Sequence, residues 1–387
     1  MRSRKNSRVS SSQVHQWALQ WLLEAQLLKD HGWLCTAVTV WNIVLRAASR
    51  MVSVFAACRD LANAPSQQAV FDALEAGLPR TLKVLEKRLN QALADPWPKR
   101  LRRYGWQVAI DWHLVPYYGQ PARSRNELYY GKPRQGTTKF HAYATACIVQ
   151  HGHRYTLALT WVRRHETMVA ALERLLVQTD GIGLKIKRLL LDRAFFNVPV
   201  TEYLQKRNLP FLMPVVMRGR RPKKRRPLTG LRWIKRQKAG WYSHTLKNGK
   251  RTVTLSVVVA YRTHKNRKDG RRVQQKLLFA AWRVHGSPTE IRERYRKRFG
   301  IEASFRQLRQ ARIYTCTRDP RLRLVFITVA LMVRNLWVWI HAEVLAEDKG
   351  RQPKLRLSRL RFKRLLDWIA QAVVAVLHDG SMPCVVL

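Results

Sequence analysis

The segment IKRLLLDRAFFNVPVTEYLQKRNLPFLMPVV, residues 186–216, decides the fold class of this chain. It opens with a predicted buried strand from Ile186 to Leu191, which ends at Asp192. A helix is predicted from Val198 to Asn208, and another strand from Pro210 to Val216. Strands that alternate with helices in this way are typical of an α/β protein.

The preceding residues supply more strands for the same sheet. Trp106 to Ile110 predicts a strand that ends at Asp111, and Phe140 to Gln150 and Tyr155 to Val162 predict two others. A helix is predicted from about His165 to Thr179. Three strands followed by helix, strand, helix and strand predict a mixed sheet flanked by helices.

The first part of the chain is predicted to be helical. Apolar residues recur at three- and four-residue steps over residues 13–95, with helices expected near 36–62, 67–76 and 81–94 as well as at the start. Ser66 is a candidate N-cap for the helix over 67–76. The Pro-rich residues 95–98 break the pattern, so we expect a helical N-terminal domain over 1–98.

Residues 217–285 differ from their surroundings in composition. They contain the turn signals Asn248-Gly249 and Asp269-Gly270, flanked by alternating β-formers. Between Glu202 and Glu290 the only acid is Asp269, against 24 Lys and Arg. This stretch is therefore predicted to be a basic β-rich insertion.

The rest of the chain is predicted to be helical. A long helix begins at Pro288 and reaches about Arg312, although Gly300 loosens it. The apolar run 322–340 is interrupted by Arg334 and Asn335, which favours a buried helix over a membrane span. We expect an α/β core over 99–216 and 286–345, the insertion over 217–285, and a C-terminal helical segment over 346–387.

The net charge of the chain limits what it binds. There are 73 Lys and Arg against 24 Asp and Glu, a formal net charge of +49 spread along most of the sequence. Nucleic acid is the usual partner of so basic a protein, whereas membrane-surface binding normally uses a local patch. The five cysteines are scattered, with no CxxC pair, and no secretory signal is recognised, so a cytoplasmic, nucleoid-associated protein is expected.

A set of carboxylates and cations has spacing that suits phosphate chemistry. Tyr295, Arg298, Glu302 and Arg309 are three, four and seven residues apart, which places them near one face of a helix. A carboxylate flanked by guanidinium groups suits a site beside a phosphate and a cation, but Arg298 and Glu302 also form an ordinary i,i+4 ion pair. Taken alone, Asp111 and Asp192 are also consistent with turn or capping residues.

These residues together resemble a known family. The stretch YRKRFGIEASFRQLR (295–309) resembles the Y-x2-R-x3-E-x6-K signature of DDE transposases from bacterial insertion sequences, in the IS-four-like branch. AIDWHLVPYYG around Asp111 and LLLDRAFFN around Asp192 support the resemblance, which covers roughly residues 100–345. Arg309 stands where the signature has Lys, so its phosphate contact differs in geometry.

The resemblance implies a ribonuclease-H-like core with the β-rich insertion between the second aspartate and the glutamate. It also implies a DNA transposase, an endonuclease and strand transferase, in which Asp111, Asp192 and Glu302 are catalytic and bind two Mg²⁺ ions, with Mn²⁺ as a substitute. Asp111 would bridge both ions, and each of the other acids would complete one site. Candidate DNA-binding residues, from the resemblance and from local charge, are Tyr295, Arg298, Arg309, Arg193, Arg220, Lys223, Lys224 and Arg225.

The expected partners are double-stranded DNA with terminal inverted repeats, target DNA, and a second copy of the chain in a synaptic complex. Residues 1–95 are assigned to the terminal repeat from position and charge, since no helix-turn-helix is recognised. Two other interpretations stay open. One is a related ribonuclease-H-like nuclease such as a junction resolvase, and the other is a transposase descendant that retains DNA binding without catalysis.

Overall fold

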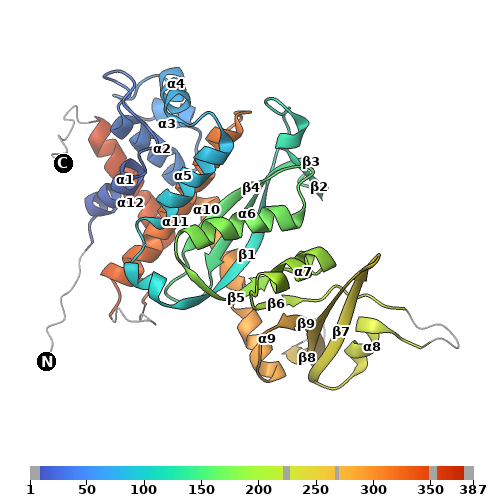
Figure 1. Ribbon diagram of the computed structural model, residues 1–387. Helices are drawn as coiled ribbons and strands as arrows, with labels where there is room; N and C mark the ends of the chain where they lie inside the picture. The colour runs from blue at the N-terminus through green and yellow to red at the C-terminus, as the bar shows by residue number, and fades with distance from the viewer. Residues whose placement is uncertain (1–8, 221–226, 266–269, 348–354, 379–387) are drawn as a thin grey trace, which may run out of the picture.

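The computed structural model describes residues 9–220, 227–265, 270–347 and 355–378. Within these residues a nine-stranded mixed sheet extends from the core into the insertion (Figure 1). The strands are β1 (Gly105–Pro116), β2 (Tyr129–Arg134), β3 (Thr137–Ile148), β4 (Thr156–Val162), β5 (Lys185–Leu191), β6 (Phe211–Pro214), β7 (Gly240–Asn248), β8 (Arg251–Lys265) and β9 (Arg272–Trp282).

Strand β1 lies at the centre of the core. It pairs antiparallel with β3 and parallel with β5, and β5 pairs parallel with β6. The far edge of β3 carries β2 and β4, both antiparallel. The parallel pairs are connected through helices, α6 (Met168–Gly181) and α7 (Val198–Lys206), as the strand–helix–strand pattern predicts.

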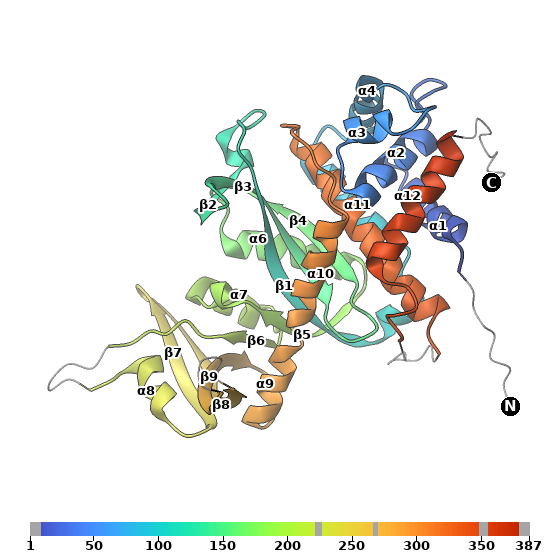
Figure 2. The ribbon, with the colours of Figure 1, turned by 180° about the vertical axis from the view of Figure 1, so that it is seen from behind.

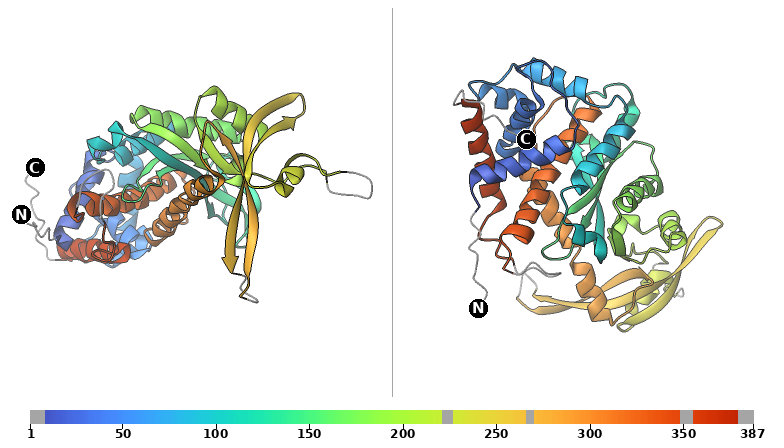
Figure 3. Two further views of the ribbon diagram at one scale, coloured as in Figure 1. Left: turned by 90° about the horizontal axis from the view of Figure 1, so that it is seen from below. Right: turned by 60° about the vertical axis from the view of Figure 1, so that its left-hand side comes forward.

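The insertion continues the core sheet. Strand β9 pairs antiparallel with β6, and β8 and β7 follow outward. The short helix α8 (Gly230–Arg236) precedes β7. The two views in Figure 3 show these yellow strands at one end of the molecule, with the blue and red helices at the other. The predicted β-rich insertion is therefore part of one sheet with the core.

Helices cover both faces of the sheet. One apolar core contains Val108, Ile110 and Leu191 together with residues of α6 and α7. The opposite core contains Ala109 and Leu190 and receives α9 (Pro288–Arg296) and α10 (Phe299–Gln310). Because successive strand residues point to opposite faces, β1 and β5 contribute to both cores.

A second body of helices combines the two ends of the chain (Figure 1). Its members are α1 (Ser11–Glu24), α2 (Ala37–Arg50), α3 (Val54–Arg59), α4 (Gln67–Gly77), α5 (Leu82–Ala94), α11 (Pro320–Trp339) and α12 (Phe362–His378). Their buried apolar residues form one continuous core. Arg46 of α2 donates to the Ala370 carbonyl of α12 over 3.0 Å, which helps to hold the C-terminal helix on the N-terminal ones.

Local signals set several helix ends. Ser66 accepts a hydrogen bond from the Ala69 N–H and caps α4, as predicted. The single stretch expected over 36–62 is divided into α2 and α3, because Met51 takes a left-handed conformation with φ 55°.

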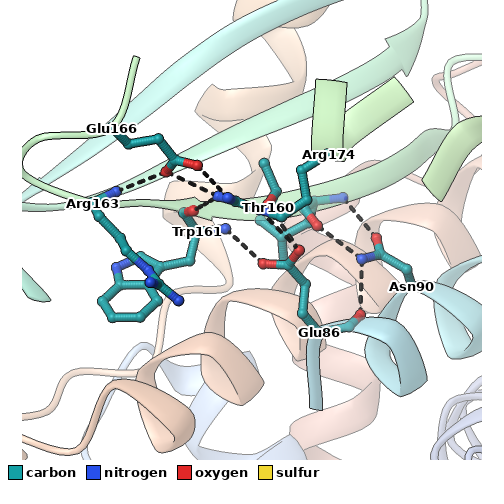
Figure 4. Close-up of polar contacts among 8 residues, drawn as sticks. Glu86, Asn90, Thr160, Trp161, Arg163, Glu166 and Arg174 are labelled. Carbon is teal, nitrogen blue, oxygen red and sulfur yellow. Dashed lines mark hydrogen bonds and ion pairs between the residues drawn. The ribbon is translucent and has the colours of Figure 1, made fainter. Parts of the chain in front are cut away.

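A buried polar network fastens α5 to the sheet (Figure 4). Glu86 accepts hydrogen bonds from Thr160 Oγ1 at 2.8 Å and from the Trp161 N–H at 3.0 Å. The Asn90 side chain both donates to and accepts from the Leu159 backbone of β4, at 2.8 and 2.7 Å. Arg174 of α6 joins Glu86 at 3.5 Å and also pairs with Glu166. The network ties the helical body to strand β4 of the sheet.

The structure corrects two predicted boundaries and adds one strand. Strand β1 continues to Pro116, so Asp111 lies inside the strand rather than at its end. The helix predicted from Pro288 to Arg312 is divided, with α9 ending at Arg296 and α10 beginning at Phe299. Strand β2 was not predicted, because Gly131 and Pro133 interrupt its β-forming residues.

The segment Pro320–Val344 is long and apolar enough to cross a membrane. In the fold, 89% of its apolar window is buried, and residues along α11 belong to the core of the helical body. The prediction of a buried core helix is confirmed.

Candidate functional site

Strand register brings the two aspartates together. Ile110 of β1 is paired with Leu191 of β5 in the parallel ladder, so Asp111 and Asp192 follow at adjacent positions. Each aspartate lies two residues beyond a residue of the same core, Ala109 or Leu190, which faces α9 and α10. Asp111 and Asp192 interact electrostatically, as expected for two carboxylates on neighbouring strands.

Asp192 also begins the turn that follows β5. Its Oδ1 accepts a hydrogen bond of 2.7 Å from the Arg193 N–H and caps a short 3₁₀ turn over Arg193–Phe195. The capping role expected for an isolated aspartate is therefore present, but it uses one carboxylate oxygen and leaves the side chain partly exposed.

The helix pair α9–α10 supplies the third acid. Figure 2 shows the two helices end to end across the back of the sheet, beside β1 and β5. Ile301 is fully buried between α10 and the sheet, and Gly300 before it packs near Arg154 and Val149. A Cβ at position 300 would lie 3.3 Å from Arg154 Nε. Glu302 follows Ile301 on α10, and its side chain is 50% exposed.

Arg298 connects two of the acids. It lies at the junction between α9 and α10 and is 6% exposed. Its Nη2 is 2.9 Å from Asp111 Oδ2, and its Nη1 is 3.7 Å from Glu302 Oε1. The predicted helix is therefore divided at the position where the Arg298 side chain contacts Asp111 of β1.

Tyr295 is held by the protein backbone. Its hydroxyl donates to the Leu191 carbonyl over 3.2 Å, and its ring contacts Phe279 with centroids 5.0 Å apart. In this structure the Tyr295 hydroxyl joins α9 to the end of β5, next to Asp192. The predicted contact of Tyr295 with the DNA backbone stays a prediction.

All three acids lie within electrostatic range of the Tyr295 hydroxyl. Burial raises the pKa of Tyr295, and Arg298, Asp192, Asp111 and Glu302 all act on that hydroxyl. Burial also raises the pKa of Asp111, against the opposing effects of Arg298 and the Trp112 N–H, while the Asp192 carboxylate raises it further. Three carboxylates and one guanidinium therefore influence one another's charge near β1 and β5.

The donor set suits a hard divalent cation, because Mg²⁺ and Mn²⁺ prefer carboxylate oxygens. Within the described part of the chain, however, no three acidic, histidine or cysteine side chains already lie at metal-binding distances from one another. Arg298 contacts both Asp111 and Glu302, through different terminal nitrogens. The residues fit such an ion by chemistry, and the side chains must rotate to bind it.

The predicted DNA-binding residues occupy different places. Arg193 is exposed beside Asp192, and Arg309 is exposed on α10, seven residues beyond Glu302. Arg220 is exposed near the start of the insertion, where its N–H donates to Thr229 Oγ1 over 3.1 Å. Lys223, Lys224 and Arg225 lie outside the described residues.

A groove of about 690 Å³ adjoins the site and was not predicted. It is lined by α9, the turn after β5 and the inner strands of the insertion, and Tyr295 and Arg193 form part of its wall. Its other cations are Lys235, Arg262, Lys276, Arg292 and Arg296, with Glu293 as the lining acid. The basic composition of 217–285 indicated the charges of Lys235, Arg262 and Lys276, but the face that they share with Arg292 and Arg296 of α9 depends on pairing between distant strands.

Comparisons with known proteins agree with this architecture. Residues 105–336 match the family model described as "Transposase DDE domain". The chain is also similar to the piggyBac transposase in a cryo-EM structure of its synaptic complex with hairpin DNA, with a TM-score of 0.51 and 12% identity, covering 100% of this chain and 84% of that one. A comparison with curated protein sequences gives no match. The structural likeness confirms the predicted fold class, a ribonuclease-H-like mixed sheet with a β-rich insertion and N-terminal helices.

Proposed function

The chain belongs to the family of transposases with a DDE domain, and on that premise we propose that it cleaves DNA at transposon ends and transfers the strands with Asp111, Asp192 and Glu302. The observation that supports this most is Arg298, which contacts Asp111 and Glu302 while Asp111 interacts with Asp192. Acids from β1, the end of β5 and α10 thus converge beside a basic groove. This convergence is the arrangement that the proposed chemistry requires.

The three carboxylates would hold divalent cations, magnesium in the cell and manganese as a substitute. When bound, the ions would neutralise the phosphodiester and activate the attacking hydroxyl. Tyr295 positions Asp192 by fixing the Leu191 carbonyl, and Arg298 sets the charge around Asp111. Arg193 and Arg309, both exposed, are proposed to hold phosphates near the acids.

The finer assignments rest on the sequence. The signature over residues 295–309 supports a bacterial insertion sequence of the IS-four-like branch. We propose terminal inverted repeats and target DNA as substrates, a homodimer in the synaptic complex, and a nucleoid-associated protein in the cytoplasm. Residues 1–98 are proposed to bind the terminal repeat from their position and charge, because they hold 12 Lys and Arg against seven Asp and Glu.

A cleavage assay tests the proposed function. The full chain is incubated with a duplex that contains the DNA flanking its gene, with Mg²⁺ or with EDTA, and the cut positions are mapped. We expect cuts at the ends of an inverted repeat in Mg²⁺ and none in EDTA. Metal-dependent cuts at branched DNA without preference for the repeat would instead indicate a resolvase, and intact DNA in both conditions would contradict catalysis.

Arg193→Gln tests the groove as a path for DNA. Arg193 is exposed at the junction of the groove and the acids, so its loss removes about one phosphate contact. We expect the slope of log K against log salt to fall by roughly one unit and binding to weaken uniformly across sequences, measured by fluorescence anisotropy with duplex DNA. Arg207→Gln is the control, because Arg207 already pairs with Asp180. An unchanged slope for Arg193→Gln would place the DNA elsewhere.

A further inference from the structure

Arg298 has the contacts of a substitute cation. Its guanidinium reaches Asp111 Oδ2 at 2.9 Å through one terminal nitrogen and Glu302 Oε1 at 3.7 Å through the other. The Asp111 side chain is 22% exposed and the Arg298 side chain 7%, so this pair is largely removed from water. A buried carboxylate needs a compensating charge, and Arg298 supplies it in the protein alone.

The contacts of Arg298 are incomplete for a fixed structural brace. A guanidinium has five N–H donors, and a settled buried arginine engages most of them. Arg298 Nε is buried and has no hydrogen-bond partner among the described residues. Its bond to Glu302 is also long, and Glu302 is half exposed and free to turn. The side chain therefore has charge complementarity on one side and an unused donor on the other.

This position conflicts with cation binding by the same acids. A divalent ion needs carboxylate oxygens at about 2.0–2.6 Å, which draws those oxygens close together. The guanidinium contacts one oxygen of Asp111 and one of Glu302, and within the described residues no three ligand groups are gathered for a metal. A positive guanidinium that stayed between the acids would also repel the ion.

We propose that Arg298 is an internal counter-ion, which occupies the place of the divalent cation in the metal-free protein and leaves Asp111 when the cation binds. The proposal rests on the proposed function, since it takes the three acids as the metal ligands. It assigns to Arg298 a positioning role: the residue keeps the acids neutralised and apart until metal arrives, and it lowers the affinity of the site for metal. The released guanidinium then has a free fork for a phosphate oxygen.

Mn²⁺ binding to the full chain without DNA tests this inference. Free Mn²⁺ is followed by electron paramagnetic resonance in the wild type, in Arg298→Gln, Arg298→Lys, Arg296→Gln and Asp111→Asn, and in the double variant that combines Asp111→Asn with Arg298→Gln. Arg296→Gln is the matched control, because it removes one arginine charge only two residues from Arg298. The Arg296 side chain is 75% exposed and pairs with Glu293. Asp111→Asn identifies the binding that belongs to the acids.

We expect Arg298→Gln to raise the Asp111-dependent affinity for Mn²⁺ at least about tenfold, and Arg296→Gln to change it less than about twofold. Arg298→Lys should lie between wild type and Arg298→Gln, because an ammonium reaches one carboxylate at a time. It also provides the test if Arg298→Gln fails to fold. Without metal, the Arg298 variants should have a lower melting temperature than the wild type. Mn²⁺ should raise the melting temperature of these variants more than it raises that of the wild type.

Equal or lower affinity in the Arg298 variants, with Asp111-dependent binding in the wild type, would overturn the inference and make Arg298 a brace for the acids. The proposed function would survive that result. By contrast, the proposed function itself would be contradicted if Asp111→Asn left the affinity for Mn²⁺ unchanged in both the wild-type and the Arg298→Gln backgrounds.

Discussion

Asp192→Asn is expected to reduce cleavage at the transposon ends by about 10³-fold or more, because losing one carboxylate of the site removes several kcal/mol of transition-state stabilisation and each 1.36 kcal/mol is tenfold in rate. The fold should be unaffected, since the Asn side-chain oxygen can still accept the Arg193 N–H that caps the turn after β5. DNA binding should be retained or slightly strengthened, because a negative charge beside the groove is removed. Single-turnover cleavage and anisotropy on the same duplex measure the two effects separately.

The matched control for this prediction is Asp180→Asn. Asp180 pairs with Arg207 at the end of α6, is 51% exposed, and contacts none of the three acids in the described contacts. We expect its cleavage rate to stay close to wild type. If Asp192→Asn cleaves at the wild-type rate, Asp192 has only its capping role and must be removed from the catalytic assignment.

Glu86→Ala is expected to lower the free energy of unfolding by about 3 kcal/mol, since it leaves a buried N–H without its acceptor and opens a small cavity. Glu86 accepts from both Thr160 and the Trp161 N–H, and its side chain is 7% exposed. Burial raises the pKa of this carboxyl, while the Trp161 N–H and the Arg174 guanidinium counteract the rise. Guanidinium chloride unfolding followed by tryptophan fluorescence measures the change.

Glu75→Ala serves as the control for Glu86→Ala, because Glu75 is an exposed glutamate on α4 in the same helical body. Its unfolding midpoint should match the wild type. A midpoint for Glu86→Ala that is also unchanged would show that the contact between α5 and β4 depends on apolar packing alone, and that the polar network in Figure 4 contributes little.

The sequence predicted the parts of the fold that local patterns specify. The alternation of strand and helix over 186–216 specified β5, α7 and β6, and Ser66 specified the start of α4. The extent of β1 was less accessible. A polar residue such as Asp111 is a common strand end in sequence, and its place inside β1 depends on pairing with Thr145 across the ladder.

The candidate site was predictable as a set of residues but not as a geometry. Spacing alone indicated that Tyr295, Arg298 and Glu302 share a helix face, but the helix is divided at Arg298. That division comes with a contact to Asp111, which is 187 positions away in the sequence, so no local signal specifies it. The same holds for the joined ends of the chain, where α12 packs on α1 and α2 through contacts more than 300 residues apart.

Anomalous diffraction from crystals of the full chain grown with Mn²⁺ would test the central claim most directly. The account predicts anomalous peaks bound by the carboxylates of Asp111, Asp192 and Glu302, at the point where β1, the end of β5 and α10 meet. Peaks held by other residues, or ordered carboxylates that remain apart while Mn²⁺ saturates the protein, would contradict it.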